Sequence, residues 1–366
     1  MVTYIHIGLP KTGSTSLQAF FRINREALRS RGVVYPVTTG STMLEAAETL
    51  FNPTEFRDVD HFREMLRHSW KKHDLAKRGN AAPSAFALLT ETPAFRAIGR
   101  SDVPTSPRLD FETCWRELSQ QAESDKALLV SSEELGAVSP FELRWRTAFD
   151  GRDKRILVYL RRQDFAIEAI YVQSVKTGLF QGTIDEYVDD VILNRNRARG
   201  VFDYRTLVSE CWQAFGREHV HVFLFEEDCG PEWIFTTALR ALGLRLDTDF
   251  DLPERSNASL HPLFVEYLRR SLIAGTWSWL LVRQVNQLTS DPAFSTGIPS
   301  GLLAPESRAR VRGHFADGNR WLASELIGEP CALFISGAYP DQFVASEYDG
   351  YFQLLDEATA SVGARK

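Results

Sequence analysis

A glycine- and hydroxyl-rich loop near the N-terminus carries the clearest chemical signal in this sequence. The segment Gly8 to Gln18 reads GLPKTGSTSLQ and lies between an apolar run that begins at Val2 and an amphipathic stretch that begins at Ser14. Glycines let backbone amides approach an anion, a helix N-terminus adds partial positive charge, and hydroxyls add donors. The pattern predicts a strand, a phosphate-binding loop and a helix, with these binding residues: Pro10, Lys11, Thr12, Gly13, Ser14, Thr15 and Ser16.

The glycine spacing matches the nucleoside triphosphate pattern GxxxxGK[ST] except at one position. Gly8 and Gly13 are both present, but Ser14 stands where that pattern has its lysine. The lysine of this loop, Lys11, comes two residues before the second glycine. A lysine there suits a cation directed at a transferring group or its bridging oxygen, and it weakens the case for Mg²⁺.

The loop resembles the 5′-phosphosulfate loop of sulfotransferases that use 3′-phosphoadenosine 5′-phosphosulfate (PAPS), in its bacterial glycan-type form. The family's second signature is a strand that ends in an arginine, followed eight residues later by a helical serine, both contacting the 3′-phosphate. Arg161 ends the run RILVYLR and fits the arginine, whose planar fork grips phosphate at two points. Ala169 stands at the serine position, and three nearby residues can substitute for the hydroxyl: Arg162, Gln173 and Ser174.

What the resemblance implies is a P-loop-like transferase that moves a sulfuryl group from PAPS to an acceptor hydroxyl, on a saccharide or glycolipid, with no metal ion. Lys11 would be a catalytic residue as well as a cofactor ligand, and Arg161 and Ser174 would complete the cofactor site. Two alternatives stay open. One is a P-loop-like nucleotide kinase, and the other is a non-catalytic nucleotide-binding module, which Ala169 favours.

Transfer to a hydroxyl also requires a base that accepts its proton. Residues just after the strands of a doubly wound sheet are candidates, because ligands collect at the carboxyl ends of such strands. The apolar run ALLVSS ends at Ser132, and in the glycan-modifying relatives a glutamate here is the general base, which points to Glu133 and then to Glu134. Glu91, in a stretch similar to the Glu-Thr-Pro motif of some relatives, is the third candidate.

The wider pattern supplies the elements that would position these residues. Short β-branched runs alternate with helical patterns from residue 2 to residue 242, which is typical of βαβ units and predicts a doubly wound parallel α/β sheet. Residues 38–107 form a less regular insert that we expect to cap the sheet or line the cleft, and residues 255–330 are mostly helical. We predict one domain over residues 1–366.

Composition excludes several other classes. The chain has 366 residues and a net charge of −6 with no basic tract, which argues against a nucleic-acid partner. Its four cysteines show no CxxC spacing, so we do not expect a zinc site. The sparse cysteines lead us to expect a reducing, cytoplasmic location. The apolar run Leu272 to Val282 is too short for the roughly 20 residues of a spanning helix and predicts a buried or surface-lying helix. Acceptor identity, oligomeric state and peripheral membrane association stay open.

Overall fold

The structure is a computed structural model. It describes residues 1–9, 11–36, 115, 118–122, 126–132, 134–137, 139–193, 202–225, 230, 232–253, 260–289, 291–294, 296–327 and 340–364. The predicted insert, residues 38–107, lies outside the described residues.

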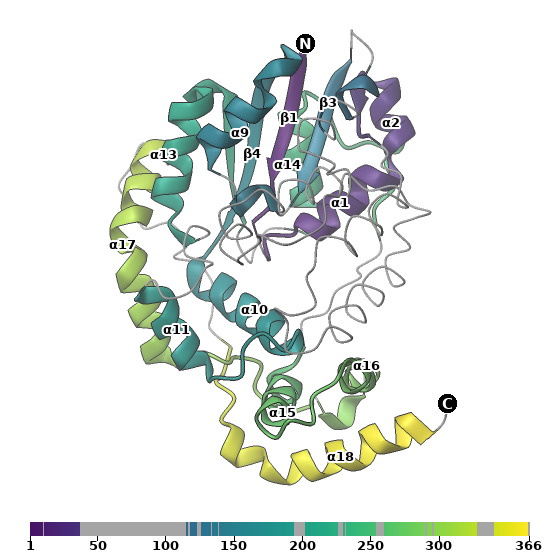
Figure 1. The fold of residues 1–366 in the computed structure, drawn as a ribbon, viewed down its shortest axis with the longest axis vertical. Coiled ribbons are helices and arrows are strands. Elements are labelled where there is room, and N and C mark those ends of the chain that lie inside the picture. The colour runs from purple at the N-terminus through teal and green to yellow at the C-terminus, as the bar shows by residue number, and fades with distance from the viewer. Residues whose placement is uncertain are drawn as a thin grey trace, which may run out of the picture. The chain divides into compact units, whose positions relative to one another are not determined.

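Five parallel strands form the sheet that the described residues contain (Figure 1). Their order is β2-β3-β1-β4-β5, and their bounds are β1 Val2–Ile7, β2 Val33–Val34, β3 Ala127–Ser132, β4 Asp153–Arg161 and β5 Val220–Phe225. Nearly continuous apolar sequence suits strands covered on both faces, and parallel neighbours require crossover connections. The α/β class predicted from the sequence is confirmed.

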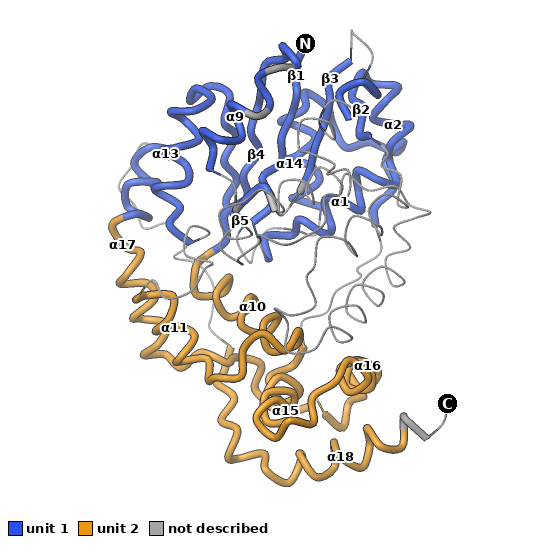
Figure 2. The backbone as a smooth tube through the Cα atoms, viewed as in Figure 1, with its two compact units in different colours: residues 1–161, 200–256, 318–333 blue, residues 162–199, 257–317, 334–366 orange. Residues whose placement is uncertain are grey.

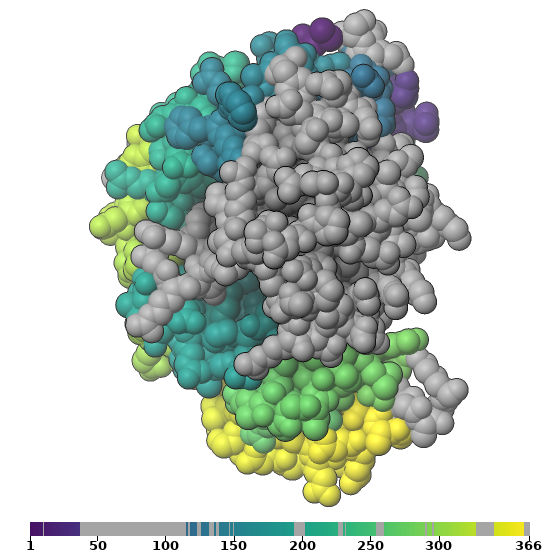
Figure 3. All heavy atoms as spheres, in the orientation of Figure 1, coloured from purple at the N-terminus to yellow at the C-terminus, as the bar shows by residue number. Residues whose placement is uncertain are grey.

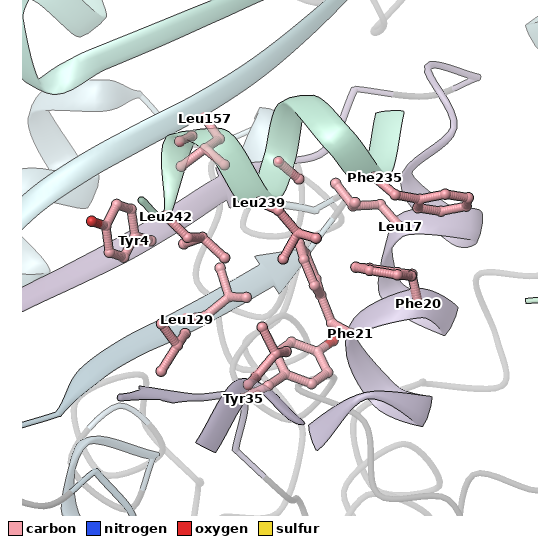
Figure 4. Close-up of a cluster of buried hydrophobic side chains, with 14 of the residues drawn as sticks. Tyr4, Leu17, Phe20, Phe21, Tyr35, Leu129, Leu157, Phe235, Leu239 and Leu242 are labelled. Carbon is pink, nitrogen blue, oxygen red and sulfur yellow. The ribbon is translucent and has the colours of Figure 1, made fainter. Parts of the chain in front are cut away.

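Helices α1 (Ser14–Ile23) and α14 (Trp233–Ala241) cover one face of the sheet. Figure 4 shows aromatic and aliphatic side chains of both helices between them and strands β1, β3 and β4. Phe20 of α1 stacks on Phe235 of α14 with ring centroids 4.7 Å apart. This packing fixes the direction in which α1 leaves the loop after β1.

The helix predicted from Ser14 onward is interrupted at Asn24, where α1 ends and α2 (Arg25–Ser30) begins. The Asn24 side chain donates to the carbonyls of Phe20 and Asp251 and accepts from the Asp251 amide, each at 2.8 Å. An asparagine that bonds backbone groups in this way competes with helix continuation, which explains the break.

The other face is covered by α9 (Pro140–Thr147) and α13 (Tyr204–Phe215). Helix α13 packs on β4, β5 and α9. In the chain, α9 lies in the connection from β3 to β4, and α13 lies in the connection from β4 to β5. Together with α1 and α14, they complete a doubly wound arrangement.

The chain divides into two compact units, each described by itself (Figure 2). The first, residues 1–161, 200–256 and 318–333, holds the sheet. The second, residues 162–199, 257–317 and 334–366, is helical in its described part. Its helices are α10 Gln163–Lys176, α11 Ile184–Ile192, α15 Pro262–Ile273, α16 Trp279–Leu288, α18 Asp349–Ala364 and the first part of α17 Pro305–Ile327. The single-domain prediction for residues 1–366 stays a prediction.

The run Leu272 to Val282 is not the one helix that its composition predicts. It spans the end of α15, a turn in which Gly275 has φ +71°, and the start of α16. The amides of Thr276 and Trp277 both bond the Ser271 carbonyl, which closes the turn, and Ser278 caps α16. Within the described chain, no helix is both long enough and apolar enough to span a membrane.

Candidate functional site

The loop after β1 contains two residues in the left-handed backbone region. Lys11 has φ +64° and Gly13 has φ +84°, and Lys11 is the one non-glycine residue with positive φ in the described chain. Such a conformation costs a non-glycine residue about 1–2 kcal/mol. Thr12 supports the turn from inside, because its buried hydroxyl donates to the Leu9 carbonyl at 2.8 Å. A strained residue held in this way is typical of a functional loop.

Gly13 is required at its position for a second reason. A Cβ built on Gly13 would lie 2.6 Å from Cδ1 of Ile234, in the first turn of α14. Ile234 belongs to the buried cluster drawn in Figure 4. A side chain at Gly13 would therefore require the end of the Ile234 side chain to move within this cluster.

Helix α1 starts directly after this glycine. It has no side-chain cap at Gly13 and no acidic residue in its first turn. Thr15 and Ser16 are exposed there, whereas Ser14 is buried. Since the first turn of a helix carries partial positive charge and N–H donors, this start suits an anion from outside the chain.

The structure brings Arg161 to the same loop. Arg161 ends β4, the direct neighbour of β1, and its Nη1 donates to the Lys11 carbonyl at 3.1 Å. Its own carbonyl accepts a 2.5 Å hydrogen bond from the Tyr204 hydroxyl, and its guanidinium lies 5.9 Å from the centre of the Phe225 ring. The two sequence motifs, 150 residues apart, thus meet at one edge of the sheet.

Of the base candidates, Glu133 and Glu91 lie outside the described residues, as does Pro10 of the loop, and the backbone but not the side chain of Glu134 is described. The segment around Glu133 reaches the loop: Ser132 is the register partner of Ile7, and a Cβ on Gly136 would lie 3.0 Å from the Gly8 carbonyl oxygen. A side chain at Gly136 would therefore crowd the backbone at the start of the loop.

His6 lies on β1 two residues before Gly8. It is fully buried, its Nδ1 shares a 2.7 Å hydrogen bond with the Ser131 hydroxyl, and its ring meets Tyr159 edge-on at 5.5 Å. Burial lowers the pKa of His6 to about 3, so the ring is neutral near pH 7. Its Nε2 has no hydrogen-bond partner in the described structure.

The residues expected after Arg161 belong to the second unit. The Ser174 hydroxyl donates to the Ile170 carbonyl at 2.9 Å, one turn earlier in α10. Arg162 is buried and holds both oxygens of Asp164, at 2.8 and 3.0 Å. Both side chains thus have partners within their own helix region.

No family model matches this chain. It is 26% identical over 226 residues to an uncharacterized protein of Archaeoglobus fulgidus, a match that covers 60% of this chain and 56% of that protein. A sulfotransferase structure from Alicyclobacillus acidocaldarius aligns with 75% of this chain and 90% of its own length, at 17% identity and a TM-score of 0.40. Likenesses this distant assign no activity, so the function is argued from the residues of the chain itself.

Some site features had no signal in the sequence. Tyr204 lies 43 residues after the arginine whose carbonyl it holds, and nothing in its surroundings marks it. Gly136 follows two glutamates after a strand, where a glycine in a close backbone approach could have been suspected. In the described part of the chain, no group of three or more His, Cys, Asp or Glu residues is placed to hold a metal ion.

Proposed function

We propose that this chain is a sulfotransferase that uses PAPS as donor and an acceptor hydroxyl as substrate. The observation that carries the proposal is the hydrogen bond from Arg161 to the Lys11 carbonyl. It joins the two motifs that the resemblance assigns to the two anionic ends of one donor. Two phosphate-binding motifs that meet in space support a bisphosphate ligand far better than either motif alone.

The described residues fit such a donor chemically. One anion needs backbone and hydroxyl donors, which the uncapped start of α1 offers with the exposed Thr15 and Ser16. A second phosphate needs a planar cation, and Arg161 is half-buried at the edge of the same loop. Bound there, the donor supplies a sulfuryl group joined to a phosphate that leaves readily.

Lys11 has the role of stabilising charge. The Lys11 side chain is exposed, and the backbone of its loop is held by Thr12 and Arg161. The loop backbone is therefore already ordered before the reaction begins. We assign its ammonium to the bridging oxygen, where negative charge grows as the oxygen–sulfur bond breaks. Positioning and charge stabilisation are what such a transfer asks of a protein.

Glu133 is the proposed base, with Glu134 and Glu91 as the other candidates. The acceptor oxygen forms the new bond to sulfur, the bond from sulfur to the phosphate oxygen breaks, and the glutamate takes the acceptor proton. Ser132 and Gly136, on either side of the leading candidates, lie beside Ile7 and Gly8 at the start of the loop. This neighbourhood supports a base at the end of β3.

A saccharide or glycolipid acceptor and a cytoplasmic location complete the proposal, both taken from the sequence-based resemblance and the cysteine usage. Ser174 stays the proposed extra ligand of the 3′-phosphate. We give no role to a metal ion, because the loop lacks the lysine that follows the second glycine in the nucleoside triphosphate pattern.

Thermal-shift titrations test the donor site directly. We expect 3′-phosphoadenosine 5′-phosphate to raise the Tm of the wild type more than 5′-AMP or Mg-ATP, because a ligand at 100 times its Kd stabilises by about 2.7 kcal/mol. Lys11→Ala should lose most of the shift, and Arg161→Ala should lose the preference over 5′-AMP. Arg217→Ala, an exposed arginine paired with Glu325, is the matched control and should behave like wild type.

The outcomes separate the alternatives. A larger shift with Mg-ATP favours the kinase, and no shift with any nucleotide overturns the cofactor assignment. Binding of the bisphosphate without sulfate transfer to any of a panel of glycan and glycolipid acceptors favours the non-catalytic module. With an acceptor in hand, Glu133→Gln, Glu134→Gln and Glu91→Gln identify the base, since only the true base should cost about 100-fold or more in kcat.

A further inference from the structure

The backbone of Arg161 lies at the end of the sheet ladder. Arg161 and Phe225 form the last register pair of β4 and β5, and α10 begins two residues later at Gln163. A residue at the end of a strand has fewer ladder bonds to hold it than a residue in the middle. The place of the Arg161 guanidinium relative to the loop after β1 therefore depends on what else fixes this strand end.

A buried tyrosine hydroxyl fixes the strand end. The Tyr204 hydroxyl donates to the Arg161 carbonyl at 2.5 Å, and Tyr204 is 2% exposed. In Figure 3, helix α13 reaches the surface beside α9. Tyr204 belongs to the opposite, inner side of α13, because its hydroxyl bonds the backbone of β4.

The position of Tyr204 is itself well held. Tyr204 is the first residue of α13, and the Asp203 side chain caps this helix by accepting from the Thr206 amide at 3.1 Å and from the Thr206 hydroxyl at 2.7 Å. Phe202, just before the cap, is 1% exposed. A residue locked by packing and by hydrogen bonds in this way can hold a binding side chain in one geometry.

The geometry that Tyr204 supports is the distance from Arg161 to the loop. The Arg161 guanidinium lies 5.9 Å from the centre of the Phe225 ring, and the same ring is 3.8 Å from the position that a Cβ on Gly13 would take. The bond from Nη1 of Arg161 to the Lys11 carbonyl, at 3.1 Å, completes the arrangement. A shift of the Arg161 backbone would change this distance, which a ligand with two phosphates has to match.

We propose that Tyr204 is a positioning residue that sets the preference for a nucleotide with a 3′-phosphate. This inference rests on the proposed function, in which Arg161 binds that phosphate. Without the Tyr204 hydroxyl, the Arg161 carbonyl loses this bond, and the guanidinium no longer has one fixed distance from the loop. The start of α1, which we assign to the 5′-phosphate, is not touched by the change.

Isothermal titration calorimetry of the full chain tests the role of Tyr204 with two probes, 3′-phosphoadenosine 5′-phosphate and 5′-AMP. We expect Tyr204→Phe to weaken binding of the bisphosphate about fivefold or more, because a hydrogen bond that orders the arginine is removed. Binding of 5′-AMP should change less than about twofold, because it does not depend on Arg161. A general loss of folding would weaken both, so the ratio of the two Kd values reports positioning.

Tyr171→Phe is the matched control. Tyr171 is also buried, and its hydroxyl also donates to a backbone carbonyl, that of Gly182, at 3.2 Å in the second unit. This variant should keep the wild-type Kd for both nucleotides. A double variant tests whether Tyr204 acts through the arginine: added to Arg161→Ala, Tyr204→Phe should change the Kd of the bisphosphate less than about twofold.

The possible failures are distinct. The inference alone is overturned if Tyr204→Phe keeps the wild-type preference for the bisphosphate, if it weakens both nucleotides equally, or if its effect is undiminished in the Arg161→Ala background. The same change of preference in Tyr171→Phe also overturns it. A wild type that binds the bisphosphate no more tightly than 5′-AMP removes the donor assignment, and the role of Tyr204 with it.

Discussion

The helices that follow β1 and β4 in the chain begin in opposite ways. Helix α1 starts after Gly13 with no carboxylate in its first turn. Helix α10 has Asp164 in its first turn, fully buried, where it accepts from Arg162 and Arg308. A carboxylate in the first turn opposes the positive end of a helix, so α10 has a counter-charge of its own there, whereas the first turn of α1 contains none.

The buried polar groups beside the two helix starts differ in the same sense. Next to the loop before α1 lies the neutral pair of His6 and Ser131. At the start of α10, Arg308 joins Asp164 to Glu168, and Arg162 stacks 4.0 Å from the Phe165 ring centre. The neutral pair adds no charge beside the loop, whereas the arginines and carboxylates of the cluster pair with one another, which suits structural support.

The largest expected effect is on the charged cluster. Arg308→Ala removes the arginine that pairs with Glu168 and leaves Asp164 with Arg162 as its one arginine partner among the described residues, and it should lower the free energy of unfolding by about 3 kcal/mol or more. Arg310→Ala, which removes an exposed pair with Asp189, should cost less than about 1 kcal/mol. Denaturant unfolding of the two variants measures the difference, and equal losses would contradict a structural role for the cluster.

The next effect concerns the loop. Gly13→Ala combines a left-handed backbone with the contact to Ile234 and should cost about 2–4 kcal/mol. Gly32 has φ +82° but nothing near a built Cβ, so Gly32→Ala should cost about 1–2 kcal/mol from the backbone alone. Thermal unfolding compares them. If the two costs are the same, Ile234 does not hold the loop.

The buried pair of His6 and Ser131 should make the free energy of unfolding depend on pH. The pKa of His6 is lowered by burial to about 3, so its contribution to stability is complete above pH 6.5 and falls as the pH drops toward 3. His6→Gln should therefore flatten the pH dependence of unfolding between pH 6 and 4 by up to about 1.4 kcal/mol per pH unit. His314→Gln, at an exposed histidine, should leave the slope as it is. An unchanged slope in His6→Gln means that the ring is not held neutral.

The smallest expected change in stability is at Lys11, where one variant tests the stability of the loop and its nucleotide binding separately. Lys11→Gly relieves the positive φ and should change the free energy of unfolding by about 1 kcal/mol at most, toward greater stability. The same variant should lose most of the Tm shift with 3′-phosphoadenosine 5′-phosphate. Calorimetry with and without the bisphosphate measures both. A clear loss of stability would mean that Lys11 has a structural role.

Much of the fold follows from local pattern. The run ALLVSS has the bounds of β3, the run RILVYLR ends with β4 at Arg161, and the apolar run that begins at Val2 is β1, whereas the short strand β2 was not predicted. The broken helix at Asn24 and the turn at Gly275 were missed, because both depend on bonds to backbone groups that periodicity does not show. The base candidates are untested, since their side chains lie outside the described residues.

The sequence by itself determined the class of sheet and predicted a phosphate-binding loop with Lys11 and Arg161, because glycine spacing, hydroxyls and apolar periodicity are local properties of a chain. Only the tertiary structure decided that Arg161 donates to the Lys11 carbonyl, that the Tyr204 hydroxyl donates to the Arg161 carbonyl, and that Arg162 forms an ion pair with Asp164. Those contacts depend on which strands become neighbours and where their carboxyl ends meet, and that is set by the packing of the whole sheet.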